Sequence, residues 1–577
     1  MKTPHNFDLL TTTEMQALFT LLEQRFNAEV EESAKSQPEF ERELRDHMLA
    51  LERCIHTNDF RRLDVDVPGI VVEGARYRRL NKKSEGKYMT LAGPIQVERT
   101  TYRGRGGHGG NTIAPLELHL GLLNNHWTSA AAETASAFIT SVPSKEAANL
   151  LSKAGSMAPS PSHLDRLAKH VSERWEANRT HFETEVRGAE HFDLPDPKDV
   201  AHIMFSLDGI MLPMKEASKS PELEQKSPSS NDKKEVGCAT VSLYNKEGER
   251  LHTVRFARMP ESRKITLHQQ LFDEVAAMHA RYPTASLQAV ADGARENWRI
   301  IQDITERLDC EVEETLDYFH ACEHLVKGLR AAGMSDDDIK VWKLRLRDEP
   351  DGERLVVEEL TFWTMASQKQ AVESEFNYFL NQGGRIEYAA LKKRHSPIGS
   401  GVQEAACKTL VTERMKRSGM SWCKPGGQAI LTLRGLTQSG RFSHAWKALR
   451  SALRQPFQVD LNLERQKHSS RGDKVYEYCR LVKAYRREDG KPAVKVIANL
   501  GQLPEDTVEN LRIALKASRE GRRVVVKRER SKRVVFSSIQ ESLAHLDVAV
   551  ALSILEESGV GEVLDSVMGR DSGEVRA

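Results

Sequence analysis

The sequence predicts a multidomain protein of mixed α+β and α/β class, in which a mixed β-sheet is interrupted by an all-helical insertion. Three observations lead to this prediction. The chain has 577 residues, which is enough for three or four domains of about 150 residues each. Segments with the period of strands alternate with helical segments between residues 196 and 329, whereas residues 330–390 contain amphipathic helical patterns alone.

The composition excludes several classes of protein. Charged residues make up 29% of the chain and hydrophobic residues 39%, which argues against a disordered chain and against a membrane protein. No apolar run approaches the ~20 residues that a membrane-spanning helix needs. Seven cysteines without a C-x-x-C pair exclude a disulfide scaffold and a cysteine-rich zinc ribbon. We therefore expect a cytoplasmic protein in a reducing compartment.

The first two regions are expected to be largely helical. Residues 1–125 combine a helical segment over 8–57 with a β-hairpin in YMTLAGPIQVERTTYRG and a glycine-rich connector over 103–111. Residues 126–195 contain three helical stretches. The third carries the basic residues Arg166, Lys169 and His170. Such a region fits a helix-turn-helix that reads DNA, or equally a helical packing unit with a solvated basic face.

The central region predicts a specific order of elements. Residues 196–329 read as β-β-β-α-β-α-β-α, beginning with the buried strand VAHIMFSLDGIML. This is the order of a ribonuclease-H-like core, with three antiparallel strands followed by parallel strands that crossover helices connect. Residues 330–390 form the helical insertion, and residues 391–457 supply the last helices of the core.

The last region, residues 458–577, is expected to be a small basic α+β tail. It contains a hairpin in KVYEYCRLVKAYRREDGKPAVKVIANLGQLP, with a turn at residues 488–490, and then a helix. Residues 461–540 contain 20 Lys+Arg and 10 Asp+Glu, a difference of +10, whereas the whole chain is at +1 (84 minus 83). This local excess favours a polyanionic partner over a merely solvated, salt-bridged face.

Three carboxylates could carry chemistry. Asp208 and Asp292 each end an apolar strand and precede glycine, in FSLDG and AVADG. The two strands are first and fourth in the predicted order and would be neighbours. Glu404 follows two glycines in SPIGSGVQEAACK, at the start of a helix. Hard oxygen ligands suit two Mg²⁺ or Mn²⁺ ions, which can support in-line attack on phosphorus. Each Asp-Gly taken alone is equally a turn.

A second cluster lies in ETLDYFHACEHL. Asp317, His320 and His324 share one helix face by their spacing of three and four residues. They could bind a metal, but the zincin pattern H-E-x-x-H is absent. We favour a supporting role, in which these side chains orient a catalytic carboxylate or contact a phosphate.

Basic and aromatic residues follow these motifs. Downstream of Glu404, contacts with DNA phosphates or a solvated helix face are both possible for Lys408, Arg414, Lys416 and Arg417. In the insertion, Trp342 and Trp363 could stack on an extruded base, but core packing is the safer interpretation.

Together, the motifs SLDG, VADG, DYFHACEHL, PIGSGVQEAACK and RMKRSGMSW resemble those of bacterial insertion-sequence transposases of the DDE class. The likeness is to the ISKra-type group, with a Mutator-like and hAT-like layout, and it covers roughly residues 70–450. It implies Asp208, Asp292 and Glu404 as the catalytic triad, with a D-x-x-H motif at Asp317 and His320. The gap of 404 − 292 = 112 residues leaves room for a helical domain. The resemblance also implies double-stranded DNA as partner (terminal repeats and target DNA), a homo-oligomer on DNA, no membrane, and a bacterial nucleoid-associated location.

The sequence departs from this group in two places. Relatives often carry cysteine pairs near the N-terminal hairpin, and here RGRGGHGGN lacks cysteine, so no metal finger is expected. The tail resembles the opening segment of a different transposase group, within the IS-four-like superfamily. The chain is therefore expected to be a fusion, with a partial module at its end. This leaves two alternatives to a transposase: a catalytically inactive DNA-binding relic, and a ribonuclease-H-like nuclease without strand transfer.

Overall fold

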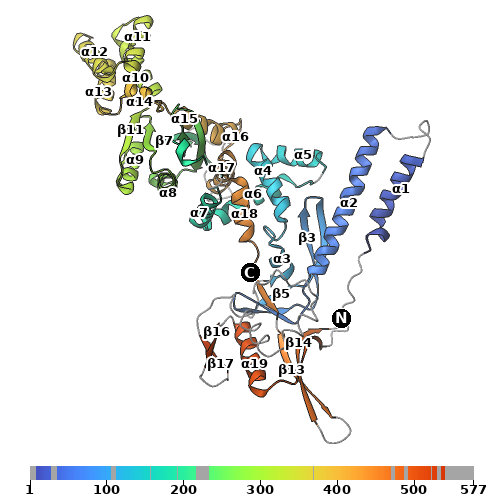
Figure 1. Cartoon of the computed structure of the whole chain (residues 1–577). Helices are drawn as coiled ribbons and strands as arrows, with labels where there is room; N and C mark the ends of the chain where they lie inside the picture. The colour runs from blue at the N-terminus through green and yellow to red at the C-terminus, as the bar shows by residue number, and fades with distance from the viewer. Residues whose placement is uncertain are drawn as a thin grey trace, which may run out of the picture. The chain divides into compact units, whose positions relative to one another are not determined.

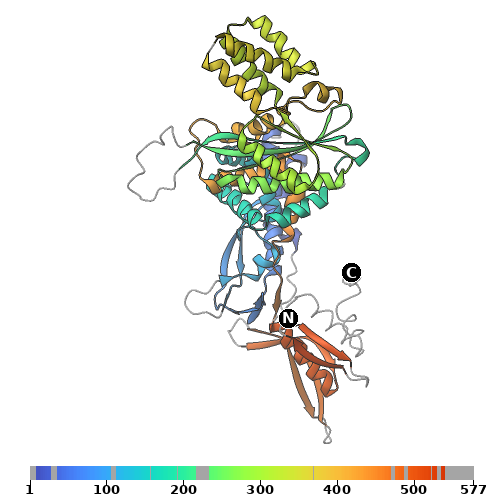
Figure 2. The same ribbon diagram turned by 90° about the vertical axis from the view of Figure 1, so that its left-hand side faces the viewer.

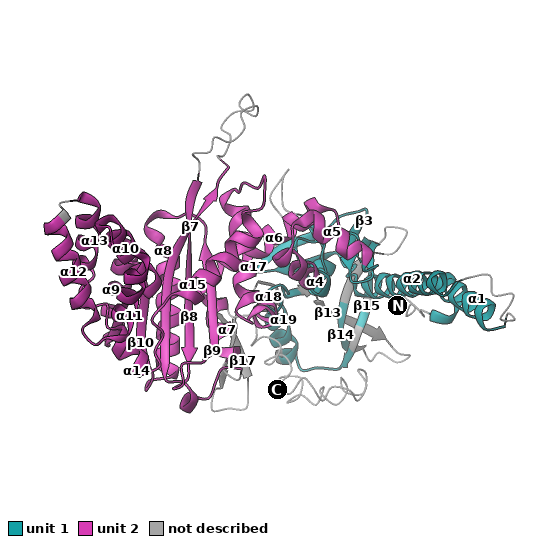
Figure 3. Cartoon of the chain, turned by 90° about the horizontal axis from the view of Figure 1, so that it is seen from above, with its two compact units in different colours: residues 1–131, 154–158, 450–577 teal, residues 132–153, 159–449 magenta. Residues whose placement is uncertain are grey.

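The computed structural model divides the chain into two compact units (Figure 3). One comprises residues 1–131, 154–158 and 450–577, and the other residues 132–153 and 159–449. The described residues are 8–27, 36–104, 112–155, 157–190, 193–215, 233–367, 369–459, 461–469, 475–486, 492–520, 523–528 and 534–539. Most of the predicted glycine-rich connector and the predicted turn at 488–490 lie outside them.

The first unit begins with a helical hairpin. Two helices, α1 (Thr13–Asn27) and α2 (Gln37–Leu63), follow the short turn η1 (Leu9–Thr11), where the pattern predicted a single helical segment. The second helix starts where the backbone N–H of Ser36 donates to the Glu39 carboxylate at 2.9 Å, as in a capping box. Figure 1 shows the two helices running side by side, and they are in contact.

Two small sheets follow. The predicted β-hairpin is confirmed as β3 (Ser84–Thr90) and β4 (Gly93–Arg99). Because Thr90 pairs with Gly93, the turn is at residues 91–92, and Gly93 and Pro94 begin the second strand instead of forming the turn. A five-stranded sheet has the order β12-β1-β2-β5-β6. Its strands, with the short helix that follows, are β1 (Gly69–Val72), β2 (Ala75–Arg79), β5 (Tyr102–Gly104), β6 (Thr112–Ile113), β12 (Phe457–Val459) and α3 (Pro115–Leu120).

The tail forms a three-stranded and a two-stranded antiparallel sheet with a helix. Its elements are β13 (Leu461–Ser469), β14 (Val475–Arg486), β15 (Pro492–Gly501), α19 (Glu505–Glu520), β16 (Arg523–Arg528) and β17 (Val534–Ile539). The predicted hairpin is confirmed, because β14 pairs antiparallel with β15. A small core of Cys479, Leu500, Val508 and Leu511 joins the three-stranded sheet to α19.

The second unit opens with helices. They are α4 (Ser129–Ser141), α5 (Ser144–Lys153), α6 (Pro161–Ala177), α7 (Arg179–Glu190) and the turn η2 (Pro197–Asp199), with the start of α4 assigned to the first unit. The hydroxyl of Ser160 caps α6 by accepting from the N–H of His163 at 3.3 Å. Arg166 and Lys169 on α6 are exposed, whereas His170 is half-buried. The helix-turn-helix stays a prediction.

The central sheet has the predicted order. Its strands are β7 (His202–Pro213), β8 (Lys233–Tyr244), β9 (Arg250–Arg258), β10 (Ser286–Ala291) and β11 (Val312–Leu316). In space they run β11-β10-β7-β8-β9. The first three are antiparallel, β10 is parallel to β7, and β11 is parallel to β10. The crossovers are η4 (Ser262–Lys264) with α8 (Ile265–Arg281), and α9 (Arg295–Leu308).

Helix α8 covers this sheet with one apolar face. Leu267, Leu271, Val275 and Met278 recur at three- and four-residue spacing and are buried with Phe205 and Leu243. This core continues into α10 (Tyr318–Ala332) and then into the insertion, which is helical as predicted and comprises α11 (Asp336–Asp348), α12 (Gly352–Ser367), α13 (Gln370–Asn381) and α14 (Tyr388–Lys393). Figure 2 shows these helices as one group beside the sheet. Trp342 and Trp363 pack against the core, which agrees with the structural interpretation.

The chain then returns to the sheet. Its last helices are α15 (Gly401–Ala406), the π-helical segment η5 (Cys407–Thr412), α16 (Glu413–Met415), α17 (Lys424–Gln438) and α18 (Phe442–Ser451). Helix α15 packs on β7 and β8, and α17 packs on β9. Among the described helices, none combines the length and apolarity that crossing a membrane requires.

Candidate functional site

Three aspartates lie level with one another on adjacent strands. Asp292 and Asp317 directly follow β10 and β11, whereas Asp208, which was predicted to end its strand, lies inside β7 and pairs with Cys238. Val290 of β10 pairs with Ser206 of β7, so Asp292 and Asp208, each two residues further on, are in register. Ala291 pairs with Leu316 of β11, which sets Asp317 level with Asp292. Because residues that are level on neighbouring strands project to the same face, the three side chains converge on one side of the sheet.

Asp208 occupies a partly dehydrated position on β7. Its Oδ1 accepts from the N–H of Gly209 at 2.6 Å, and its Oδ2 is 3.8 Å from the thiol of Cys407. Burial raises the pKa of the Asp208 carboxyl above its usual value, and the charge of Asp292 raises it further, although the N–H of Gly209 opposes both. The ionised carboxylate at this position therefore gains stability from a cation.

Asp292 is held at the start of the loop after β10. Its Oδ1 accepts from the N–H of Ala294 and from Nδ2 of Asn297, both at 3.1 Å. Its backbone carbonyl accepts from the hydroxyl of Tyr378 on α13 at 3.2 Å. Gly293 follows in the left-handed region (φ +93°), and a Cβ there would lie 2.8 Å from the Tyr378 oxygen. The helical insertion thus fixes the loop that carries Asp292.

Asp317 is fully buried and connects three elements. Its Oδ1 accepts from the N–H of His320 at 2.8 Å, and its Oδ2 accepts from the N–H of Ser400. Burial alone would raise the pKa of Asp317, but the hydrogen bonds from His320 and Ser400 hold it at about 2. This carboxylate therefore ties the end of β11 to the start of α10 and to the loop before α15.

Glu404 lies on the first turns of α15 and is exposed. Two neighbouring side chains dock this helix. Val402 packs against Met204 and Val290, and Nε2 of the buried Gln403 donates to the carbonyl of Cys238 at 2.9 Å. Met204 and Val290 lie an even number of residues from Asp208 and Asp292, so they are on the same face of the sheet. Glu404 and the aspartates are therefore on one side.

Ligand atoms of Asp317, His320 and Glu404 all lie within 4.8 Å of one another. Nδ1 of His320 is 3.3 Å from Oδ1 of Asp317. Because the Asp317 carboxylate accepts from the protonated ring, the pKa of His320 rises to about 9, although burial opposes this. Both Asp317 oxygens already accept hydrogen bonds, so this pair is better placed to position Glu404 than to bind a cation itself. Among the described residues, the group that meets this 4.8 Å distance does not include Asp208 or Asp292, so the structure does not bring all three members of the predicted triad together in this way.

His324 lies on α10 and contacts the insertion. Its Nδ1 is 2.5 Å from the carboxylate of Glu375 on α13, and its ring stacks on Tyr378 with centroids 3.5 Å apart. Since Tyr378 in turn holds the carbonyl of Asp292, His324 supports the site through one intervening side chain.

The four predicted basic residues differ in placement. Lys408 and Lys416 are exposed, and Arg417 pairs with Glu146 at 3.2 Å. Arg414 is 3% exposed, donates to the carbonyl of Ile139 at 3.4 Å and lies over the ring of Trp422. Its guanidinium is committed to packing within the unit, so we leave it out of the proposed DNA surface.

Reasoning from the sequence missed several neighbours of the site. Asn297 could have been found from its position near Asp292 at the start of a helix. Phe319 is 59% exposed beside His320, and a Cβ on Gly399 would lie 3.0 Å from its ring. Tyr378, 86 residues after Asp292, gave no signal, because its role depends on how the insertion packs.

Comparison with known families places one segment of the chain. Residues 465–529 match the model of the IS1634 family transposase, N-terminal domain. This segment lies in the tail, where the sequence predicted the opening part of a transposase, and the match supports an insertion-sequence transposase. No curated protein matches the chain.

Proposed function

We propose that the chain is the DNA transposase of a bacterial insertion sequence, and that Asp208, Asp292 and Glu404 are its catalytic triad. The observation that carries this proposal is the register that sets Asp208 level with Asp292, with Glu404 on a helix docked over the same face. The strand order β11-β10-β7-β8-β9, with a helical insertion before the last carboxylate, supports a ribonuclease-H-like core of the ISKra-type group.

The triad would hold two Mg²⁺ or Mn²⁺ ions, which activate a water or a 3′-hydroxyl and stabilise the leaving oxygen during attack on phosphorus. The chain's own residues prepare this chemistry. Asn297 and the N–H of Ala294 orient the Asp292 carboxylate, and Gly209 does the same for Asp208. Asp317 fixes the loop from which α15, and with it Glu404, begins.

Double-stranded DNA is the proposed substrate, both as the terminal repeats of the element and as target. Lys408 lies one helical turn beyond Glu404, and Lys416 follows on the same connection, so both can neutralise phosphates beside the triad. The exposed Phe319 ring offers a flat apolar surface on which a base can stack. A homo-oligomer would bring two DNA ends together.

A second candidate function is a catalytically inactive, DNA-binding relic of a fused mobile element. The observation that favours it is the position of the family match, because a transposase N-terminal module lies at residues 465–529, after the proposed core instead of before it. This order fits two elements joined end to end.

The experiment uses the full chain and DNA that carries both flanks of its gene. We expect Mg²⁺-dependent cleavage at the element ends and products joined to target DNA, both lost in Asp292→Ala. Binding without cleavage by the native chain would favour the relic. Cleavage without joined products would favour a ribonuclease-H-like nuclease. A native chain that neither binds nor cleaves this DNA would overturn the proposal.

A further inference from the structure

The helical hairpin of the first unit presents large apolar side chains to solvent. Phe19 and Phe26 on α1 are 47% and 75% exposed, and Met48 and Ile55 on α2 are 50% and 41% exposed. Each pair is separated by seven residues, so each forms a stripe along one face of its helix.

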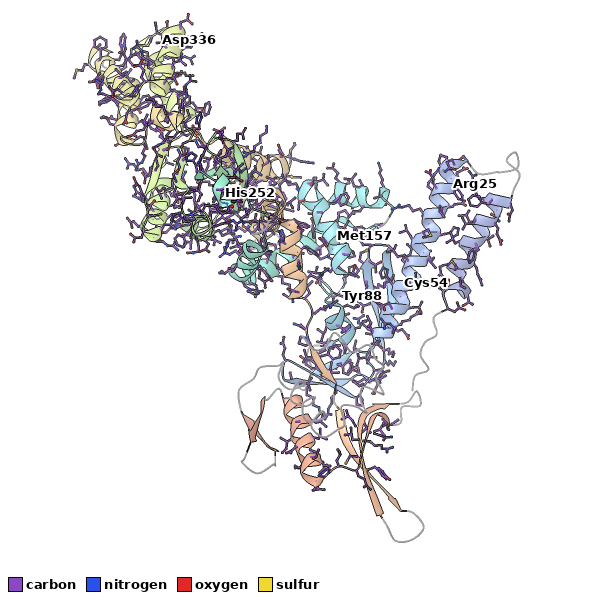
Figure 4. All side chains as sticks on the ribbon, viewed as in Figure 1. Arg25, Cys54, Tyr88, Met157, His252 and Asp336 are labelled. Atoms are coloured by element: carbon purple, nitrogen blue, oxygen red, sulfur yellow. The ribbon has the colours of Figure 1, made fainter. Side chains whose placement is uncertain are left out.

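The two stripes lie on the same side of the hairpin. Arg25 is 4.9 Å from the ring centroid of Phe40, and Glu14 interacts with Cys54, so these residues mark the faces through which α1 and α2 meet. In Figure 4, Arg25 and Cys54 lie toward opposite ends of the hairpin. With 3.6 residues per turn, successive residues are rotated by about 100° about the helix axis. On each helix, the exposed apolar stripe is rotated by about 100° from the residues that contact the other helix, and the sense of rotation is the same on both. In antiparallel helices, equal rotation in one sense leads to one side.

We propose that this hairpin face, defined by Phe19, Phe26, Met48 and Ile55, binds a second copy of the chain. The sequence of α2 is complementary to itself about a two-fold axis between residues 51 and 52. Antiparallel packing of α2 on its copy sets Met48 opposite the second copy's Ile55. It also sets Glu41 opposite the second copy's Arg62, which is 72% exposed. Opposite charges therefore meet at both ends of an apolar centre, as an isologous interface requires.

The charges near the stripe argue against a nucleic acid at this face. Glu41, Glu52 and Asp59 follow the stripe along α2, and such carboxylates would repel phosphates. The inference does not depend on the proposed function, because it concerns a surface without any of the proposed catalytic residues.

Sedimentation velocity on the full chain, over a range of concentrations and without DNA, tests this face. We expect a dimer whose dissociation constant rises at least about tenfold in Met48→Lys, because a buried apolar contact is replaced by a charge. Leu91→Lys is the matched control, since Leu91 is 39% exposed in the same unit but lies in the turn between β3 and β4 and not on the helical hairpin. This variant should leave the dissociation constant unchanged. Melting temperatures of both variants should stay near that of the native chain.

A charge exchange tests the two-fold pairing itself. Glu41→Arg should weaken the dimer by roughly two- to fivefold, since exposed ion pairs are weak, and Glu41→Arg combined with Arg62→Glu should restore it. A native chain that is monomeric at all concentrations, or a dimer that Met48→Lys leaves intact, would overturn the proposal. A dimer weakened by Met48→Lys without restoration in the exchanged variant would overturn the two-fold arrangement.

Discussion

Two clusters of carboxylates in the second unit differ in what neutralises them. Glu190 and Glu274 are buried around Arg441, whose guanidinium donates to Glu274 at 2.5 and 2.9 Å and to Glu190 at 2.8 Å. Asp208, Asp292 and Glu404 have no lysine or arginine in ion-pair contact among the described residues. The first cluster is neutralised by an arginine held between its carboxylates, whereas at the second the charges of His320 and Lys264 offset the burial of Asp208 only in part.

The pKa values follow this difference. Hydrogen bonds from His252 and Arg441, with the charge of Arg441, lower the pKa of Glu190 in spite of its burial. The pKa of Asp208 is raised, because burial and the charge of Asp292 outweigh the N–H of Gly209. The ionised Asp208 carboxylate is thus destabilising in the folded protein, whereas the ionised Glu190 carboxylate is stabilising.

The largest expected effect is on activity. Asp292→Asn should reduce DNA cleavage to background and abolish the binding of Mn²⁺, because an anionic carboxylate of the proposed metal site becomes a neutral amide. The melting temperature of the metal-free protein should stay the same or rise, since a repulsion with Asp208 is removed. Cleavage assays and calorimetric Mn²⁺ titration measure the first effect, and thermal unfolding in EDTA the second. A lower melting temperature would mean that Asp292 is structural.

At the cluster of Glu190, Glu274 and Arg441, we expect a large effect on stability and none on metal binding. Arg441→Met should cost about 3–5 kcal/mol of unfolding free energy, because it removes the arginine that both buried carboxylates share and leaves Glu274 with Arg187 at 3.6 Å and Glu190 with His252 at 3.1 Å. Urea unfolding measures this cost. If the variant folds, its affinity for Mn²⁺ should equal that of the native chain, and reduced affinity would contradict the separation of the two clusters.

Asp317 tests whether the site depends on a carboxylate that does not bind the cation itself. Asp317→Asn should lower cleavage by about 10- to 100-fold, the usual cost of losing a group that orients a metal ligand. Excess Mn²⁺ should recover part of this activity, but should not rescue Asp292→Asn. An Asp317→Asn variant with native activity would contradict the positioning role.

His320 gives a weaker, pH-dependent effect. Its pKa is raised to about 9 by the hydrogen bond with Asp317, so the pair contributes stability that is fully present below pH 6.5 and is lost as the pH rises through about 9. Melting temperatures in EDTA between pH 6 and 9.5 should therefore fall more steeply for the native chain than for His320→Gln. Parallel profiles would show that the pair does not contribute.

The smallest effect concerns DNA. Lys408→Ala should weaken binding of all DNA sequences about equally and reduce the salt dependence of log K by about one unit, as expected for one phosphate contact. Lys246→Ala, in the turn after β8, is the control and should change neither quantity. A loss of sequence preference in Lys408→Ala would argue for a base contact instead.

The order of strands and the separation of the insertion could be predicted, because the change from period two to period 3.6 is local in sequence. The strand end at Asp292 was equally visible, since a polar residue after a buried strand marks an edge. The predicted strand end at Asp208 was wrong, because β7 continues to Pro213. The π-helical segment after Glu404 and the burial of Arg414 were not predictable, because both depend on contacts with distant helices. Arg414 looks like any basic residue on an amphipathic helix until Ile139 and Trp422 surround it.

The hydroxyl of Tyr378 on the carbonyl of Asp292 has a consequence for how this protein can be altered. The helical insertion cannot be removed without loss, because its Tyr378 donates the hydrogen bond that holds the loop at Asp292. An insertion from another protein would supply helices, but this hydrogen bond would be lost unless the new insertion has a tyrosine at the equivalent position. A chimera should therefore be checked first for a hydroxyl group that donates to the carbonyl of Asp292.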